Sequence, residues 1–168
     1  MPPKAHAIVV IGIAGSGKTT VARELARHCG HVFLDADDFH TAEARAGMEA
    51  GIPLTDVQRE PWVDALAREL QRNVQQGLST VLAFSGLRAA HRQCLRDSGV
   101  PMRFVFLHAA PSVIATRLSE RQDHFMPPEL LASQLDTLEV PTGEPDVVAV
   151  DVDRPREEVL AEVISALQ

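Results

Sequence analysis

The sequence predicts an α/β protein with a three-layer α/β/α fold, in which helices cover both faces of a five-stranded parallel sheet. Three observations lead to this fold class. Short apolar segments alternate along the chain with longer segments whose apolar residues recur at helical spacing. The short segments are almost continuously hydrophobic, which is typical of strands that are buried on both faces. The first of them runs directly into a glycine-rich sequence of the form G-x-x-x-x-G-K-[ST], at residues 12–19.

The first strand and helix flank this glycine-rich sequence. Residues 7–13 are apolar and predict a buried strand. The helix expected over residues 18–28 has its apolar positions three and four residues apart, so that they share one face: Val21, Ala22, Leu25 and Ala26. A short second strand follows over residues 32–34 and ends in an acidic sequence.

Two helices are expected before the third strand. The first, over residues 42–50, has a weak pattern and is closed by Gly51 and Pro53. Thr55 or Asp56 can cap the second, which reaches residue 76, and its inward face carries four apolar residues, Val63, Leu66, Leu70 and Val74.

The second half of the chain continues the alternation. Strands are expected over residues 80–84, 103–107 and 147–150, with helices over 89–97, from Pro111 to about residue 121, and over 129–137. Proline is favoured in the first turn of a helix, and Pro155 therefore starts a terminal helix. Its inward positions are Val159, Val163, Ile164 and Leu167.

Size and composition set limits on function. The chain has 168 residues, enough for one domain with a proper core, so we expect a single domain over 1–168. The net charge of −7 argues against a nucleic-acid partner, because such surfaces are basic. The sequence shows neither a signal peptide nor an apolar run near 18 residues, and we therefore expect a cytoplasmic protein with no membrane partner.

The glycine-rich sequence predicts a phosphate-binding loop. Glycines let successive backbone N–H groups point at phosphate oxygens, and the positive end of the following helix faces the same point. Lys18 would reach the β- and γ-phosphates, and the Thr19 hydroxyl would hold Mg²⁺. We therefore expect ATP and Mg²⁺ as cofactors; the alternative is an ordinary glycine turn. The predicted nucleotide-binding residues are Gly12, Ala14, Gly15, Ser16, Gly17, Lys18, Thr19 and Thr20.

Carboxylates follow the second strand, at the edge of the sheet where ligands bind in this fold class. One carboxylate can hold the metal and another can accept a proton from an attacking hydroxyl. We assign Asp35 to the metal and Asp37 to the base, with the reverse assignment open. The alternative is an acidic turn that caps the next helix. His40 either hydrogen-bonds a polyol or caps the turn.

Further candidates follow the third and fourth strands. Ser85 and Arg88 flank a glycine that permits close approach of a substrate, and Arg88 can pair with an anionic acceptor. Arg117 and Arg121 lie one turn apart, so one can stack on adenine while the other stabilises the migrating phosphoryl group. Arg121 has the second role in our assignment. The alternative is a solvated pair of charges near Glu120. Residues 122–128 are the best candidate for a mobile flap.

Nearly the whole chain resembles the gluconokinases, small P-loop kinases related to shikimate and nucleoside monophosphate kinases. The specific sequences are 37–40 (Asp-Asp-Phe-His), 51–56 (Gly-Ile-Pro-Leu-Thr-Asp) with Arg59, Pro61 and Trp62, 124–127 (His-Phe-Met-Pro), and Ser133-Gln134 with 137–139 (Thr-Leu-Glu). The resemblance implies the P-loop kinase fold and ATP-dependent phosphorylation of D-gluconate to 6-phosphogluconate. It also implies a homodimer, an acceptor-binding region near 38–77 and a lid near 117–137. Arg59 and His124 join the expected substrate-binding residues.

The sequence departs from the family pattern mainly on the acceptor side. The differing positions are Thr41, Ala44, Gly47, Gln58, Arg88 and His91. Losing polar contacts to a substrate hydroxyl can shift specificity by orders of magnitude. The sequence therefore leaves three alternatives open: a kinase of a related polyol acid, a kinase of another small acceptor such as shikimate or a nucleoside monophosphate, and a non-catalytic nucleotide-binding protein.

Overall fold

Five parallel strands form one sheet in the order β2-β3-β1-β4-β5 in a computed structural model that describes residues 4–52, 54–120 and 128–168. The predicted five-stranded parallel sheet is confirmed, with strand ends that differ from the expected ones by at most two residues. β1 is central and pairs with both β3 and β4, so the loops after these strands are neighbours. The strands are β1 (Ala7–Ile11), β2 (Val32–Asp35), β3 (Thr80–Ala83), β4 (Met102–His108) and β5 (Val147–Asp151).

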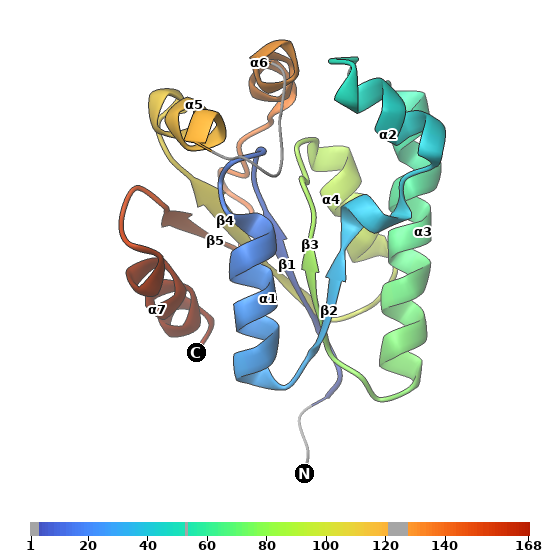
Figure 1. Ribbon diagram of the computed structural model, residues 1–168. Coiled ribbons are helices and arrows are strands. Elements are labelled where there is room, and N and C mark those ends of the chain that lie inside the picture. Colours follow the sequence, from blue (N-terminus) through green and yellow to red (C-terminus); the bar gives the residue numbers. More distant parts are fainter. Residues whose placement is uncertain (1–3, 53, 121–127) are drawn as a thin grey trace.

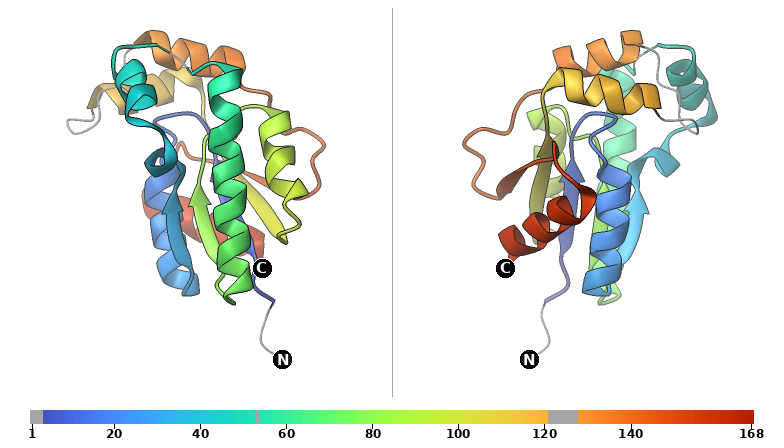
Figure 2. Two further views of the ribbon diagram at one scale, coloured as in Figure 1. Left: turned by 90° about the vertical axis from the view of Figure 1, so that its right-hand side faces the viewer. Right: turned by 60° about the vertical axis from the view of Figure 1, so that its left-hand side comes forward.

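Helices cover both faces of the sheet and one of its ends. α1 (Lys18–Cys29) and α7 (Arg156–Leu167) lie on one face, and α3 (Asp56–Gln75) and α4 (Ala89–Asp97) lie on the other (Figure 1). The other three surround the carboxyl ends of the strands (Figure 2): α2 (Ala42–Glu49), α5 (Pro111–Glu120) and α6 (Pro128–Thr137). Within the described residues, none of these helices combines the length and apolar character of a membrane span.

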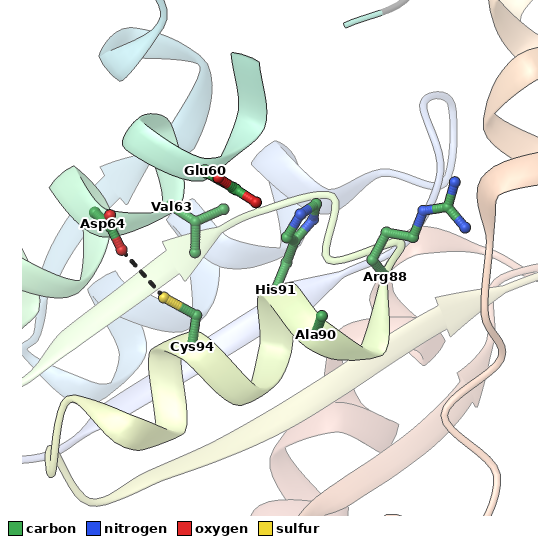
Figure 3. Close-up of a pocket in the computed structure, with 7 residues that line it drawn as sticks. All are labelled: Glu60, Val63, Asp64, Arg88, Ala90, His91 and Cys94. Atoms are coloured by element: carbon green, nitrogen blue, oxygen red, sulfur yellow. Dashed lines mark hydrogen bonds between the residues drawn. The ribbon is translucent and has the colours of Figure 1, made fainter. Parts of the chain in front are cut away.

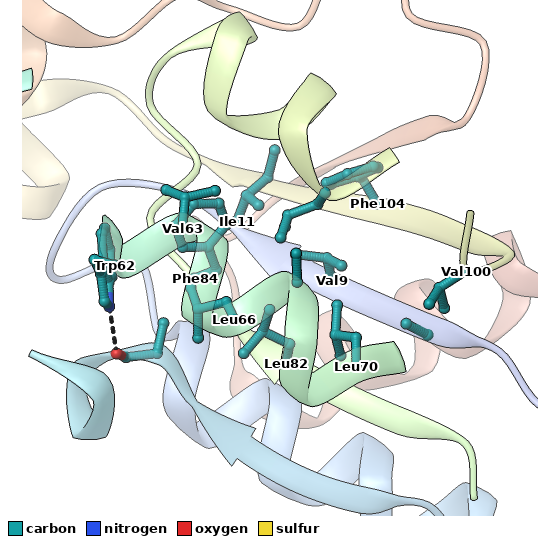
Figure 4. Close-up of a cluster of buried hydrophobic side chains, with 14 of the residues drawn as sticks. Val9, Ile11, Trp62, Val63, Leu66, Leu70, Leu82, Phe84, Val100 and Phe104 are labelled. Carbon is teal, nitrogen blue, oxygen red and sulfur yellow. Dashed lines mark hydrogen bonds between the residues drawn. The ribbon is translucent and has the colours of Figure 1, made fainter. Parts of the chain in front are cut away.

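Successive residues of β1 point to opposite faces of the sheet and anchor two apolar clusters. Val9 and Ile11 pack with the inward face of α3, as Figure 4 shows, and Ile8 and Val10 pack with α1 and α7. The faces predicted for these helices are confirmed: the apolar residues expected to point inward are buried or pack against the clusters. Packing on both faces fixes where each strand ends, and so where each following loop begins.

Local sequence sets the helix ends. The hydroxyl of Thr55 accepts the Gln58 N–H (3.1 Å) and the Gln58 side chain accepts the Thr55 N–H (2.9 Å), so Thr55, and not Asp56, is the cap of α3. Thr41 caps α2 by accepting the Ala44 N–H (3.1 Å). Two positions at which this sequence departs from the gluconokinase pattern thus have structural partners. Pro111 is the first residue of α5, as predicted.

Candidate active site

The loop after β1 has the backbone that a phosphate cradle needs. Gly15 and Gly17 have φ angles of 83° and 91°, in the left-handed region that favours glycine. Gly17 also precedes α1 without providing a side-chain cap, and the first turn of α1 carries no acidic residue. The N–H groups at this helix start are therefore left for an anion, and the helix dipole favours one there.

The two side chains that we expect to bind Mg²⁺ lie within hydrogen-bond distance of each other, although one comes from α1 and the other from β2. Thr19 Oγ1, in α1, donates to Asp35 Oδ2 at the end of β2 (3.1 Å). The other carboxylate oxygen of Asp35 accepts the Asp37 N–H (3.0 Å), which fixes the carboxylate relative to the following turn. A hydroxyl and a carboxylate are the hard oxygen donors that Mg²⁺ prefers, so this pair fits that ion. Lys18 Nζ donates to the Ile13 carbonyl (3.1 Å) and so stays within the loop.

The 3₁₀ helix η1 (Ala36–Phe39) presents Asp37 to solvent beside positive groups. His40 Nε2 lies 3.5 Å from Asp37 Oδ1. Its hydrogen bond, together with the positive charges of Lys18 and Arg45, lowers the pKa of Asp37 against the opposing effect of desolvation. Asp37 is therefore a carboxylate at neutral pH that can accept a hydrogen bond from a hydroxyl, and its lowered pKa makes it a weak base.

Trp62 supports this turn from α3. Its ring stacks on the His40 ring with centroids 4.1 Å apart, and its Nε1 donates to the Ala36 carbonyl (2.7 Å, Figure 4). The His40 side chain is only 4% exposed, and its backbone N–H closes η1 on the Asp37 carbonyl. Both readings of His40 thus have support, because it ends the turn and its ring also borders the cavity described next.

One cavity of about 670 Å³ brings most of the predicted residues together. Its lining includes the phosphate loop, the strand-end carboxylates and residues of the acceptor region: Ala14, Gly15, Gly17, Lys18, Thr19, Thr20, Asp35, Asp37, His40, Arg59 and Ser85. Gly12 and Ser16 lie behind this surface. A Cβ on Gly12 would meet the Leu107 carbonyl at 2.7 Å, and Ser16 is 1% exposed, so both residues pack against the protein interior and not against the cavity.

Comparison with known proteins identifies the family of this chain. A family model described as an AAA domain matches residues 8–141, so the chain is a member of that domain family. The gluconokinase of Gluconobacter oxydans (strain 621H) is 39% identical over 165 residues, which cover 98% of this chain and 93% of that protein. The chain belongs to the gluconokinase family.

Two solved structures share the whole fold. A gluconokinase from Sinorhizobium meliloti 1021 is 41% identical with a TM-score of 0.88, and the match covers 99% of this chain and 93% of that one. An unliganded sugar kinase from Janibacter sp. HTCC2649 is 38% identical with a TM-score of 0.90, covering 97% and 94%. Seven of the residues that carry the resemblance to gluconokinases line the cavity here: Asp37, His40, Leu54, Arg59, Trp62, Ser133 and Gln134.

Two arginines expected at this gluconokinase site lie beside the cavity and not in it. Arg88 Nη1 is 3.9 Å from Glu139 Oε1. Arg88 lines a second cavity, of about 520 Å³, between α3 and α4 (Figure 3). Arg117 is half-buried and its Nη2 donates to the Val152 carbonyl, beyond the end of β5. The nucleotide and acceptor roles of these arginines stay predictions. Arg121, His124 and the expected flap at 122–128 fall largely outside the described residues, which resume at residue 128.

Sequence reasoning did not assign several residues of this site. Arg45 donates to the Asp37 carbonyl (2.8 Å) from α2, and Gln134 accepts the Ala14 N–H (2.8 Å) from α6. Both lie on helices beside the sheet, so inspection of the strand ends could not find them. The Ser133-Gln134 sequence was visible as a gluconokinase feature but had no role attached to it. Other lining residues to which the sequence assigned no role are Arg23, Met48, Glu49, Ala83, Leu87 and Leu118.

Proposed function

We propose that the protein is an ATP-dependent kinase that phosphorylates the terminal hydroxyl of a sugar acid, D-gluconate in the first place, to give 6-phosphogluconate. The observation that carries the proposal is the cavity in which a phosphate loop faces two carboxylates at the end of β2. The carboxylate of Asp37 lies in the same cavity as Lys18, so an acceptor hydroxyl bound by Asp37 would face the transferring phosphoryl group. Gluconokinase relatives that match nearly the whole chain support this choice of acceptor.

The proposed transfer is a direct in-line displacement. The backbone of 15–19 and Lys18 hold the phosphates of ATP, while Thr19 and Asp35 would hold Mg²⁺, which neutralises phosphate charge when bound. The acceptor oxygen forms a bond to the γ-phosphorus as the bond from that phosphorus to the bridging oxygen breaks and ADP leaves. Asp37 accepts the hydroxyl proton late in this step, in keeping with its lowered pKa. Arg121, together with Arg117, would stabilise the migrating charge.

Regions of the chain divide these tasks in our proposal. Residues 38–77 bind the acceptor: Arg45, Leu54, Arg59 and Trp62, from α2, α3 and the loop between them, line the cavity. Residues 117–137 form the proposed lid region, of which α6 already packs on the phosphate loop in this structure, and its residues Leu118, Ser133 and Gln134 line the same cavity. We further propose a cytoplasmic homodimer, on the resemblance to the family. Light scattering of the protein as it elutes from a size-exclusion column tests the oligomeric state.

A related polyol acid is the second candidate acceptor, and a specific observation favours it. Ala44 and Gly47 carry no polar side chain in α2, where the family pattern has an asparagine and a lysine. Arg88 and His91 line the second cavity, away from Asp37. An acceptor with fewer or differently placed hydroxyls would have fewer hydroxyls without a hydrogen-bond partner in this cavity.

The deciding experiment is a coupled assay of ADP release with Mg²⁺ and ATP. The panel holds gluconate, other sugar acids, shikimate and nucleoside monophosphates, and ³¹P NMR identifies the phosphorylated carbon. Gluconate as the clear best substrate would support the first proposal and refute the shift in acceptor. Nucleotide binding without turnover on any acceptor would refute the kinase proposal itself.

A further inference from the structure

The contact between α6 and the phosphate loop assigns a task to a residue that the mechanism above does not use. The Ala14 N–H donates to Gln134 Oε1 at 2.8 Å, across 120 residues of sequence. Both residues line the main cavity. Because a backbone N–H can only donate, the Gln134 atom that faces it must be the carbonyl oxygen. A peptide of the phosphate loop is therefore held by a side chain from a distant helix.

α6 is held firmly enough for this contact to restrain the loop. Leu131 and Leu135 of α6, with Leu138 just after it, pack with Ile13 of the phosphate loop and with the buried Leu87 and Ile114. Just beyond its C-terminal end, the Glu139 N–H donates to the Leu87 carbonyl (2.7 Å), and Arg92 donates to the Glu139 carbonyl (3.0 Å). α6 thus bridges the phosphate loop and the loop after β3.

The Gln134 contact is compatible with a bound nucleotide. The amides that surround the start of α1 belong to residues 15–19, and Ala14 precedes them. The hydrogen bond to Gln134 therefore orients the peptide that enters the cradle without using a donor that the phosphates need. A restrained loop loses less conformational freedom when it binds, which raises affinity.

We propose that Gln134 is a positioning residue that fixes the entrance of the phosphate loop, through Ala14, in both the free and the nucleotide-bound protein. The proposal rests on the proposed function for its effect on turnover, but its effects on nucleotide affinity and on the Ala14 amide do not depend on the acceptor. Gln134 is half-exposed, so replacing it removes one hydrogen bond and leaves the buried core intact.

The test compares wild type with Gln134→Met, which keeps the length of the side chain but offers no carbonyl oxygen. Asp136→Asn is the control, since Asp136 is exposed on the same helix and lies outside the cavity lining. Calorimetry with a non-hydrolysable ATP analogue and Mg²⁺ should show affinity about five- to tenfold lower for Gln134→Met, because the binding step must then also order about one loop residue that Gln134 holds in wild type. In assays with the best acceptor, the kcat of Gln134→Met should be lower than that of wild type, while the KM for the acceptor stays the same.

A second measurement follows the Ala14 amide itself. Amide hydrogen exchange by NMR should show Ala14 protected in wild type with and without the ATP analogue, and unprotected in Gln134→Met. Loss of protection on nucleotide binding, or tighter binding by Gln134→Met, would show that the nucleotide displaces Gln134 and would overturn the proposal. Unchanged affinity and protection in the variant would overturn it as well. If wild type binds the analogue but phosphorylates no acceptor, the proposed function fails while these two readouts still decide the role of Gln134.

Discussion

Replacing Arg92 with methionine should destabilise the fold more than any other single change to a charged residue described above. Arg92 is 1% exposed, although it lies on a helix of the surface layer. Its guanidinium holds Glu144 through two hydrogen bonds (3.1 and 2.7 Å) and donates to the carbonyls of Gly86 (2.6 Å) and Glu139 (3.0 Å). Methionine fills a similar volume but satisfies none of these acceptors.

The size of the effect follows from what is left behind. Breaking a buried ion pair from one side costs about 3–5 kcal/mol. Glu144 keeps a second partner, Arg96 (2.6 Å), so we expect the lower end, about 3 kcal/mol. For a domain of this size that loss lowers Tm by about 6–12 °C. The comparison variant is Arg96→Met, because the Arg96 side chain is 20% exposed, against 1% for Arg92, and its loss leaves Arg92 on Glu144. Since it also frees Asp146, a smaller loss of about 1–2 kcal/mol is expected there.

Urea denaturation measures both variants, with fluorescence of Trp62, the single tryptophan of the chain, as the probe. The hydrogen bonds of Arg92, and then those of Arg96, lower the pKa of Glu144. The stability that this pairing contributes is present above the ordinary pKa of a glutamate and is lost as pH falls through the lowered value. Arg92→Met should reduce that acid dependence. A loss below 1 kcal/mol, with the acid dependence unchanged, would refute the reasoning.

Three further predictions concern the site. Lys18→Ala should lower kcat/KM by about two to three orders of magnitude with unchanged circular dichroism, and unchanged turnover would remove the phosphate-loop argument. Gly86→Ala should lower the free energy of unfolding by about 1–3 kcal/mol and reduce activity strongly, because its φ is 58° and a Cβ there would meet Ile11 Cγ2 at 2.6 Å. The control is Gly30→Ala, where φ is 71° and a Cβ would meet no atom within 4 Å. It should lower the free energy of unfolding by only about 1 kcal/mol in the same denaturation assay. Asp37→Asn should lower kcat by about 10²–10⁴. Because the pKa of Asp37 is lowered, the wild-type kcat should stay constant as pH falls past the ordinary pKa of an aspartate, and should decrease only when Asp37 binds a proton. The same decrease at low pH in Asp37→Asn would show that another group causes it.

The parts of the site that sequence predicts are those set by short-range pattern and topology. Thr19 and Asp35 could be paired in advance because β1 and β2 run parallel, so the residues after them must appear at one edge of the sheet. The cap at Thr55 could be proposed because Thr-x-x-Gln supplies both halves of a capping box within four residues. Each inference needs only the local sequence and the direction of the strands.

The parts that sequence did not predict depend on partners far along the chain. Nothing near Arg92 indicates that a charged residue is buried in α4, since its carboxylate partner lies 52 residues away. Gln134 and Ala14 are separated by 120 residues, an interval that contains three of the five strands. Arg88 could not be separated from the acceptor site in advance, because a loop residue takes its direction from its neighbours, here Glu139. Such pairings are fixed only once the helices have packed.

The contacts of the residues that depart from the family pattern bear on which acceptor the protein binds. The departures from the gluconokinase pattern at Thr41 and Gln58 serve helix caps, so they need not be lost substrate contacts. Arg88 and His91 line the second cavity, between α3 and α4, which leaves recognition of the acceptor to groups that share a cavity with the phosphate loop. The charged and polar groups of that cavity outside the phosphate loop include Arg23, Asp37, His40, Arg45, Glu49, Arg59, Ser85, Ser133 and Gln134. Arginines that share a cavity with carboxylates suit a polyol that carries a carboxylate, and we therefore expect the departures at Arg88 and His91 to change the surroundings of the acceptor more than its chemical class.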